Sequence, residues 1–399
     1  MMEVSTVRTG PASPRARGRR PTARRAVAPL AAALFFFGPA LAFVAGDRAV
    51  EIENRRLPEF PALSRGWDVI PDAEAWATAH LSLRRYAVRA DAALSELLFG
   101  DASSHARTGR PDYPRVVEGR DGWLYFGDDV TEACRPRRPV ADTLERLRRL
   151  AEIVRGSGRR FLVTVAPDKT TVYPHRLPER FPGQSCLGER KREFWAALRM
   201  ARLPGYVDLR GPLERTQRDS GAPAYWRTDS HWTERSAGLY GAELARALDP
   251  GLSRHTRLVR TGRAVRDGDL GGLLGVPREE TVERWRLDRD GVRRLRQDDR
   301  ELPVSFRTAN ASGRASLYRP RTLLIGDSFT RNSLPWVLPY FADLTYLRSD
   351  APATVGADQV AWEVARSETV VVEIVERHLV GGRVEMLDDA VLAALERAL

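Results

Sequence analysis

The chain has 399 residues, enough to bury the core of one large domain and a smaller one. Hydrophobic residues make up 43% of it, which excludes a mainly disordered protein. The net charge is +11, and so basic a chain raises the question of nucleic-acid binding. The arginines are scattered among acidic residues and form no single basic stripe with interleaved aromatic side chains, so we expect no nucleic-acid partner. Attraction to an anionic surface or polymer accounts for the charge equally well.

The first element in chain order is an apolar segment near the N-terminus. Residues 26–45 carry no charge, and a helix of this length crosses about 30 Å of hydrocarbon. Because the arginine-rich residues 1–25 precede this span and acidic residues follow it, we expect a cytoplasmic tail, a transmembrane signal anchor and an extracytoplasmic remainder. The chain would then be a single-pass protein of the cell membrane. The alternative is a secreted protein whose signal peptide is cleaved near residues 40–42.

Residues 46–110 are predicted to form a juxtamembrane segment with helical character. Within it, residues 72–98 combine a helix-forming composition with an apolar face. Residues 103–114 are polar, contain Gly and Pro, and look like a linker. The main domain is therefore expected to occupy residues 111–399.

From Val116 onward, strand-like and helix-like segments alternate. A turn and an aromatic strand are expected over 119–126. Further strands are predicted over 161–166, 206–209, 322–325, 344–347 and 369–375. Helices are predicted over 141–155, 190–200, 233–248, 331–340, 358–365 and 385–399. Continuously apolar strands are typical of a sheet covered on both faces, so we expect an α/β fold with a doubly wound, mostly parallel sheet. A charged, Gly-containing excursion or β-rich insertion interrupts it over about 252–320.

Cys134 and Cys186 are the two cysteines of the chain. In an extracytoplasmic protein they can form one disulfide, and two unpaired thiols are the alternative. Their spacing gives no metal signature, and the sequence has no CxxC or HxxxH motif. We expect neither a metal nor a cofactor.

The apolar strand 322–325 is followed directly by Gly326-Asp327-Ser328. In open α/β sheets, reactive groups gather at the carboxyl ends of the strands. A turn at this place exposes the Ser328 hydroxyl and directs backbone N–H groups at developing negative charge, which makes Ser328 a candidate nucleophile. The alternative is an ordinary turn in which Asp327 caps the next helix.

Asp229 lies two residues before His231, just ahead of a predicted helix. In an extended or turn segment both side chains can point to the same side. Asp229 can then accept a hydrogen bond from one ring nitrogen while the other nitrogen faces Ser328, giving the acid, base and nucleophile of a serine acyl-transfer site. Alternatively, Asp229 or Ser230 only caps the helix, and His231 is a surface residue.

Several short motifs together resemble a known family. They are Glu53-Asn-Arg-Arg56, Gly119-Arg-Asp-Gly-Trp-Leu-Tyr125, Ala166-Pro-Asp-Lys169, Val172-Tyr-Pro174, Tyr225-Trp-Arg-Thr-Asp-Ser-His-Trp232, Gly268-Asp-Leu270, Gly326-Asp-Ser-Phe-Thr330 and Val375-Glu-Arg377. Over about residues 50–380 the chain resembles the alginate O-acetyltransferase AlgJ/AlgX family. The resemblance implies an SGNH-hydrolase-like fold with Ser328 as nucleophile, His231 as general base and Asp229 as its orienting acid. It also implies that a membrane-bound O-acyltransferase partner delivers the acetyl donor.

A second group of residues supplies candidates for substrate binding. They are Asp168, Lys169, Arg331, Asn332, Trp232 and Arg377. The two consecutive residues 168–169 and Arg377 follow strands on the expected side of the site, residues 331–332 come just after the serine, and the tryptophan can stack on a sugar ring. Structural ion pairs, surface solvation and core packing are the respective alternatives.

Three functions remain open from the sequence. The first is an extracytoplasmic O-acetyltransferase that moves an acetyl group through the Ser-His-Asp triad onto hydroxyls of an exported or cell-surface polysaccharide. The second is a carbohydrate acetylesterase, in which water replaces the acceptor hydroxyl. The third is a non-catalytic glycan-binding surface protein, against which the intact Asp229, His231 and Ser328 argue.

Overall fold

The computed structural model describes residues 37–38, 41–46, 60, 69–80, 113–298, 303–310 and 312–399. The chain divides into two compact units. One comprises residues 1–51 and 56–85, and the other comprises residues 52–55 and 86–399. The candidate site residues predicted from the sequence all belong to the second unit.

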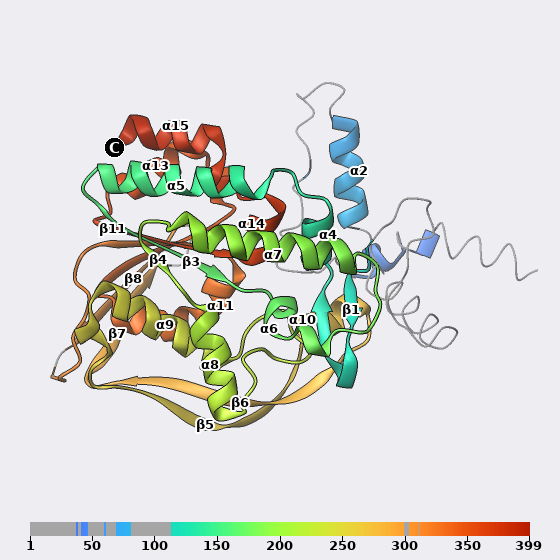
Figure 1. Ribbon diagram of the computed structural model, residues 1–399, viewed down its shortest axis with the longest axis horizontal. Coiled ribbons are helices and arrows are strands. Elements are labelled where there is room, and N and C mark those ends of the chain that lie inside the picture. Colours follow the sequence, from blue (N-terminus) through green and yellow to red (C-terminus); the bar gives the residue numbers. More distant parts are fainter. Residues whose placement is uncertain are drawn as a thin grey trace, which may run out of the picture. The chain divides into compact units, whose positions relative to one another are not determined.

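The described part of the first unit contains helix α2 (Val69–Ala79) (Figure 1). Trp76 stacks on His80, with ring centroids 4.6 Å apart, and Phe60 meets Trp76 edge-on. Helix α2 covers the start of the helical segment expected over 72–98, whereas residues 81–98 lie outside the described residues. Most of the expected membrane span 26–45 lies outside them as well. Within the described ranges, no helix has both the length and the apolar character that a membrane crossing requires.

A seven-stranded mixed sheet forms the centre of the second unit. Its strand order is β4-β3-β11-β9-β10-β8-β7. The strands are β3 (Arg160–Ala166), β4 (Tyr206–Val207), β7 (Val292–Asp298), β8 (Val304–Asn310), β9 (Thr322–Gly326), β10 (Asp343–Arg348) and β11 (Thr369–Val375). From β4 to β10 the neighbours pair in parallel, and β8 joins β10 in antiparallel register. All residues of β9 and β11 are buried, as the continuous apolar runs predicted.

Helices cover both faces of this sheet, which makes the fold a doubly wound α/β fold. Figure 1 shows α5 (Val140–Gly156), α13 (Ala357–Ala365) and α15 (Asp389–Ala398) on one side and α9 (Glu234–Leu248) and α11 (Ser328–Val337) on the other. Helix α5 illustrates why they pack. Leu144, Leu147, Leu150 and Val154 recur at helical spacing and are all buried. Helices α7 (Gln184–Ala201) and α8 (Arg210–Ser220) complete the connections around β4.

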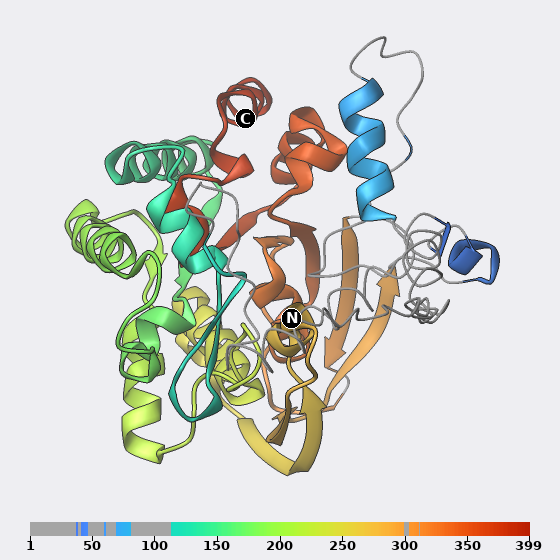
Figure 2. The same cartoon turned by 90° about the vertical axis from the view of Figure 1, so that its right-hand side faces the viewer.

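The described residues of the segment 252–320, expected to be an excursion or a β-rich insertion, contain four strands. Two of them, β5 (Thr256–Asp267) and β6 (Glu279–Arg289), form a separate antiparallel ribbon on the side of the domain away from α5 and α15 (Figure 2). The other two are β7 and β8, which extend the main sheet at its β10 edge. The short helix α10 (Asp269–Leu274) connects β5 to β6. It shares a small apolar cluster with the hairpin of β1 (Val116–Glu118) and β2 (Leu124–Phe126).

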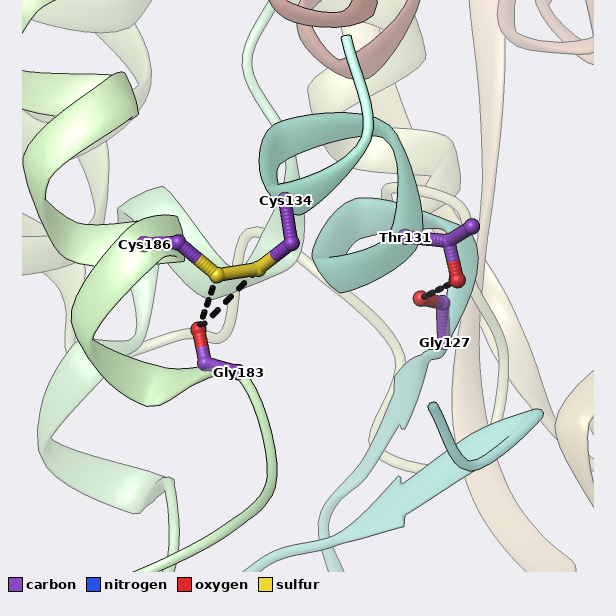
Figure 3. The surroundings of a disulfide bond; sticks show 5 residues. All are labelled: Gly127, Thr131, Cys134, Gly183 and Cys186. Atoms are coloured by element: carbon purple, nitrogen blue, oxygen red, sulfur yellow. Dashed lines mark hydrogen bonds between the residues drawn. A yellow bond between two sulfur atoms is a disulfide. The ribbon is translucent and has the colours of Figure 1, made fainter. Parts of the chain in front are cut away.

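Cys134 and Cys186 form a disulfide, with Cα atoms 5.2 Å apart (Figure 3). Of the two alternatives left open by the sequence, the structure therefore has the bonded one. The bond joins the end of α4 (Asp128–Cys134) to the first turn of α7. The carbonyl oxygen of Gly183 lies 3.4 Å from Cys134 Sγ and 3.2 Å from Cys186 Sγ. The disulfide therefore holds α4 against α7, the helix that carries the buried Lys191.

Candidate active site

The predicted nucleophile, Ser328, is the first residue of α11, directly past the carboxyl end of β9. Asp327 is the N-cap residue of this helix, and its Oδ1 accepts a hydrogen bond from Phe329 N–H at 2.8 Å. Its Oδ2 accepts another from Val375 N–H at 2.8 Å. The turn is thus tied to the central strand β11. Because Ser328 occupies the first helical position, its own N–H has no partner within the helix and is available to an oxyanion at the helix N-terminus.

Close contacts with helix α11 and strand β11 explain the glycine before this turn. A Cβ on Gly326 would meet Thr330 Oγ1 at 2.4 Å and Glu373 Oε2 at 3.0 Å, so a larger residue displaces the turn. Glu373 Oε2 accepts hydrogen bonds from Thr330 Oγ1 at 2.8 Å and from Asp327 N–H at 3.2 Å. Burial, reinforced by the charge of Asp327, raises the pKa of Glu373 well above its ordinary value, which favours the neutral carboxyl. The buried Glu373 therefore stabilises the turn that carries Ser328 through its hydrogen bonds to Asp327 and Thr330, which lie before and after the serine.

The predicted base contacts both the serine and the predicted acid. His231 Nε2 is 2.8 Å from Ser328 Oγ, and His231 Nδ1 is 2.8 Å from Asp229 Oδ1. The backbone N–H of His231 also donates to Asp229 Oδ1, at 2.9 Å, which fixes the two-residue spacing as a tight turn. A carboxylate only accepts, so Nδ1 carries the ring proton and Nε2 of the neutral imidazole accepts the serine O–H. The three residues form an acid–base–nucleophile chain.

The electrostatics of the pair follow from its burial and its partners. Burial alone lowers the pKa of His231, but the hydrogen bonds and charges of Asp229 and Asp269 outweigh it and raise the pKa to about 9. For Asp229, burial raises the pKa, and the hydrogen bond and charge of His231 together with the charge of Arg266 overcome this and lower it to about 2. The structure therefore favours a charged carboxylate beside a strongly basic imidazole.

Lys169, predicted as a substrate-binding residue, is buried against the loop that carries Asp229 and His231, the acid–base loop. Its Nζ donates to three carbonyl oxygens, those of Leu124 at 2.6 Å, Arg227 at 2.9 Å and Asp229 at 2.7 Å. Burial lowers the pKa of Lys169 to about 7. The amine thus joins the β1–β2 hairpin to the backbone of the acid–base loop, and its side chain contacts protein groups.

Asp168 and Arg377, also predicted to bind substrate, belong to a buried network of charges. Asp168 Oδ1 lies 3.0 Å from Arg377 Nη1, and its Oδ2 lies 2.9 Å from Lys191 Nζ. Glu376 accepts the N–H of Asp168 at 2.8 Å and lies 3.4 Å from the same lysine. The side chain of Asp168 is fully buried within this network, whereas Arg377 reaches a pocket at the site.

The pocket beside Ser328 has a volume of about 350 Å³. Its lining contains five arginines and five acidic residues, so it offers hydrogen-bonding groups of both charges. The lining residues are Phe126, Asp128, Glu132, Arg137, Asp327, Ser328, Arg331, Tyr346, Arg348, Ser349, Asp350, Arg377, His378, Arg383 and Glu385. Two of the arginines are paired within the wall, Arg348 with Asp350 and Arg383 with Glu132. The pocket is therefore polar and close to neutral, and suits a hydroxylated ligand.

The remaining predicted binding residues differ in their placement. Arg331 is exposed and lines the pocket, one turn after the serine. Asn332 is exposed on the same helix and is not part of the pocket lining. Trp232 is only 2% exposed, and its Nε1 donates to Ser333 Oγ at 2.9 Å. Its ring is therefore packed in the core, the alternative to sugar stacking.

Two site residues were not singled out from the sequence, Asp269 and Arg266. The Oδ2 of Asp269 lies 3.4 Å from His231 Nδ1, and Arg266 forms an ion pair with Asp229 Oδ2. Both residues come from the β5–α10 part of the segment 252–320. The only signal for Asp269 was its place in the Gly268-Asp269-Leu270 motif, to which the sequence assigned no role.

In the part of the chain that the structure describes, one group of acidic and histidine side chains lies close enough together to hold a metal ion. Donor atoms of Asp229, His231 and Asp269 lie within 4.8 Å of one another. Their hydrogen bonds account for this closeness, since His231 Nδ1 binds Asp229 Oδ1 and Arg266 covers the other oxygen of Asp229. The arrangement fits a hydrogen-bonded acid–base pair, in which each of these atoms already has a partner.

Several curated proteins with similar sequences are named as probable alginate O-acetylases. The probable alginate O-acetylase AlgJ of Pseudomonas syringae pv. tomato is 26% identical over 135 residues, which are 34% of this chain and 34% of that protein. Its counterpart from Pseudomonas putida is 27% identical over 176 residues, 44% of this chain and 42% of that protein. The match to these curated relatives thus spans between a third and a half of their length. Among solved structures, the O-acetyltransferase domain of Pseudomonas putida AlgJ aligns with a TM-score of 0.47 and 19% identity, over 71% of this chain and 99% of that domain.

A protein-family model also matches the chain. Residues 116–340, more than half of the chain, match the model of the SGNH hydrolase-like domain of acetyltransferase AlgX. This range contains the acid–base pair, the serine and the whole β5–β6 segment, and it confirms the resemblance inferred from the short motifs. The chain therefore belongs to the AlgX family of SGNH hydrolase-like acetyltransferase domains.

Proposed function

We propose that the protein is an O-acetyltransferase that carries an acetyl group on Ser328 and passes it to a hydroxyl of a polysaccharide outside the cytoplasm. The observation that supports this most directly is the unbroken contact chain Asp229–His231–Ser328, with 2.8 Å at each of its two side-chain contacts. The membership of the chain in an acetyltransferase family indicates that the transferred group is an acetyl group.

In the first half-reaction, Ser328 Oγ attacks the carbonyl carbon of the acetyl donor while its proton moves to His231 Nε2. The tetrahedral oxyanion that forms lies at the N-terminus of α11, where the N–H of Ser328 and the helix dipole stabilise negative charge. The donor's leaving group departs with the proton from His231. The product is an acetyl ester on Ser328 and a neutral imidazole.

In the second half-reaction, His231 Nε2 takes the proton from an acceptor hydroxyl as that oxygen attacks the acetyl carbon. The tetrahedral intermediate collapses, the bond to Ser328 Oγ breaks, and the serine recovers the proton from His231. Asp229 holds the ring orientation and stabilises the imidazolium in both halves. One base therefore serves both steps, and no other reactant is required.

The acceptor we propose is an exported or cell-surface polysaccharide, and alginate is the polymer named in the relatives. Arg331 and Arg377 at the pocket wall provide donors for sugar oxygens or carboxylates. The donor is supplied by a membrane-bound O-acyltransferase partner, and residues 26–45 anchor the chain beside it in the cell membrane. Asp168 and Lys169 act in this scheme by positioning the site, since their charged groups bind protein atoms.

The test uses an acetyl ester as donor, with and without an oligosaccharide acceptor. Ser328→Ala and His231→Gln are expected to abolish the formation of acetylated sugar, followed by mass spectrometry. The matched control is Ser157→Ala. This serine lies between α5 and the amino end of β3, whereas the site lies at the carboxyl ends of the strands. If both triad variants acetylate the acceptor as fast as the parent, the proposal fails.

The same experiment separates transfer from hydrolysis. Accumulation of acetylated oligosaccharide on addition of the acceptor supports the transferase. Release of free acetate at a rate independent of the acceptor instead identifies a carbohydrate acetylesterase that uses the same three residues.

A further inference from the structure

The segment between β5 and β6 brings a second carboxylate to the catalytic histidine. Asp269 Oδ1 accepts the backbone N–H of Ser230 at 2.7 Å, and its Oδ2 accepts the Ser230 hydroxyl at 2.5 Å. The same Oδ2 lies 3.4 Å from His231 Nδ1. The ring nitrogen that binds Asp229 therefore faces two acids, one on its own loop and one on helix α10.

Packing fixes the position of Asp269. A Cβ on the preceding Gly268 would lie 1.9 Å from the carbonyl oxygen of Thr228, so the two backbones meet without room for a side chain. Leu270 N–H donates to that same carbonyl at 3.3 Å. The leucine is fully buried, in an apolar cluster that includes Val116 and Leu124. Helix α10 is thus anchored on both sides of Asp269, and the acid is held by a packed element.

The same segment also neutralises the first carboxylate. Arg266, near the end of β5, pairs with Asp229 Oδ2, and its guanidinium stacks on the ring of Trp226 at 3.7 Å from the centroid. The N–H of Asp269 reaches Asp229 Oδ2 as well, at 3.5 Å. Two carboxylates and one guanidinium therefore surround the imidazole, leaving a net negative charge that an imidazolium balances.

We propose that Asp269 is a second positioning carboxylate for His231, and that the segment from Arg266 to Asp269 completes the acid–base site. Asp229 orients the ring, and Asp269 holds the Ser230–His231 backbone and adds negative charge at the same ring edge. Its part in catalysis rests on the proposed function, whereas its effect on the imidazole can be measured without any transfer of acetyl groups.

The charged groups around His231 come from several elements. Those that face it or its partners are Asp229 on the loop, Asp269 on α10, Arg266 on β5, Lys169 at the start of α6 (Lys169–Val172) and Arg377 at the start of α14 (Glu376–Gly381). Arg377 acts from a distance, through the ring of Phe329, which packs 4.9 Å from the imidazole. Asp269 is the only acid among these whose side chain is substantially exposed, at 38%. It can be altered with little change in the core.

The experiment is a histidine ring titration by NMR on the full chain, with isotope-labelled histidine. The chain has six histidines, and the signal missing from His231→Gln identifies the catalytic one. Asp269→Asn keeps the size of the side chain and removes its charge. We expect it to lower the titration midpoint of His231 by about one pH unit, the lower end of the effect of a charge at this distance because the acid is partly exposed.

The matched control is Asp267→Asn, an exposed acid two residues earlier at the end of β5, which is expected to leave the midpoint unchanged. Asp269→Glu restores the charge and is expected to recover part of the shift. If Asp269→Asn moves the midpoint no further than the control does, while its urea-unfolding midpoint matches the parent, the proposal is overturned.

Kinetics separate this result from the proposed function. Because the neutral imidazole is the base, Asp269→Asn is expected to move the rising part of the pH profile of kcat/KM about one unit toward lower pH. A shift in the His231 titration without any acetyl transfer by the parent chain refutes the proposed function and supports the positioning role. Transfer by the parent with an unshifted titration refutes the positioning role alone.

Discussion

His231 and Ser328 are 97 positions apart in the chain, yet His231 Nε2 lies 2.8 Å from Ser328 Oγ. Two further contacts join the same parts of the chain, Trp232 Nε1 with Ser333 Oγ at 2.9 Å and Tyr240 Oη with Thr330 Oγ1 at 3.0 Å. Helix α11 is therefore hydrogen-bonded both to helix α9 and to the loop that precedes α9. The catalytic contact is one of these bonds, and its geometry depends on how α11 packs against both.

The first prediction concerns pH. Because the pKa of His231 is raised to about 9, the neutral imidazole that accepts the serine proton becomes abundant only as the pH rises toward that value. The kcat/KM for an acetyl ester should therefore increase about tenfold per pH unit between pH 6 and 8 and level off near pH 9. A plateau already reached near pH 7 would contradict the hydrogen-bonded environment described for His231.

The second prediction concerns the buried amine of Lys169. Lys169→Met keeps the length of the side chain but leaves the buried carbonyl oxygens of Leu124 and Asp229 without their shared donor, whereas the carbonyl of Arg227 still accepts the N–H of Leu124. Each unsatisfied group costs about 1–3 kcal/mol, so we expect the free energy of unfolding to fall by at least about 2 kcal/mol. Urea denaturation measures this. Arg257→Met is the control, because that side chain is 83% exposed and its loss should cost little.

The third prediction separates packing from sugar binding at Trp232. Trp232→Phe removes the indole N–H that binds Ser333 but keeps an aromatic ring in the core. A double-mutant cycle with Ser333→Ala should give a coupling of about 1 kcal/mol in the free energy of unfolding. The KM for the oligosaccharide acceptor should not change, since the ring is 2% exposed. A large rise in KM without loss of stability would instead point to direct contact with the sugar.

The fourth prediction concerns the disulfide. Cys134 and Cys186 are separated by 52 positions, and closing a loop of that size stabilises a fold by about 4 kcal/mol in the chain-entropy model. The double variant Cys134→Ser/Cys186→Ser should lower the urea midpoint and raise the denaturant slope, because the unfolded chain without the cross-link exposes more surface. Reduction of the parent should give the same loss, and the double variant should not respond to the reductant. Equal midpoints for the oxidised parent and the variant would show that the bond adds nothing.

Much of the fold was predictable because its elements carry their own signals. The strand expected over 369–375 is observed as β11 with the same bounds, since a short, mostly apolar run rich in β-branched residues is typical of a strand in a sheet covered on both faces. Helix α5 extends the expected 141–155 by one residue at each end. Helix α8, by contrast, was not expected. Its sequence is mostly polar, and its apolar contacts, such as the buried Leu213, become visible only in the folded chain.

The site was predictable in part for the same reason. Ser328 and the pair Asp229 and His231 lie beside recognisable elements, and their spacing restricts where they can point. The role of Asp269 depends on how the segment between β5 and β6 returns to the acid–base loop, which no local pattern encodes. Lys169 was placed at the correct end of β3, but its burial depends on the hairpin that covers it.

The strand order has a consequence for the synthesis of the protein. β11 is the last strand to be made, and it lies in the middle of the sheet, paired on both sides with β3 and β9. A nascent chain that lacks residues 369–375 leaves two long apolar edges without partners, which are prone to aggregate. Strand β9, which precedes the nucleophile, therefore pairs with β10 first and gains its second neighbour, β11, only after the other strands of the sheet have been made. A chain that ends before residue 369 should be insoluble rather than weakly active.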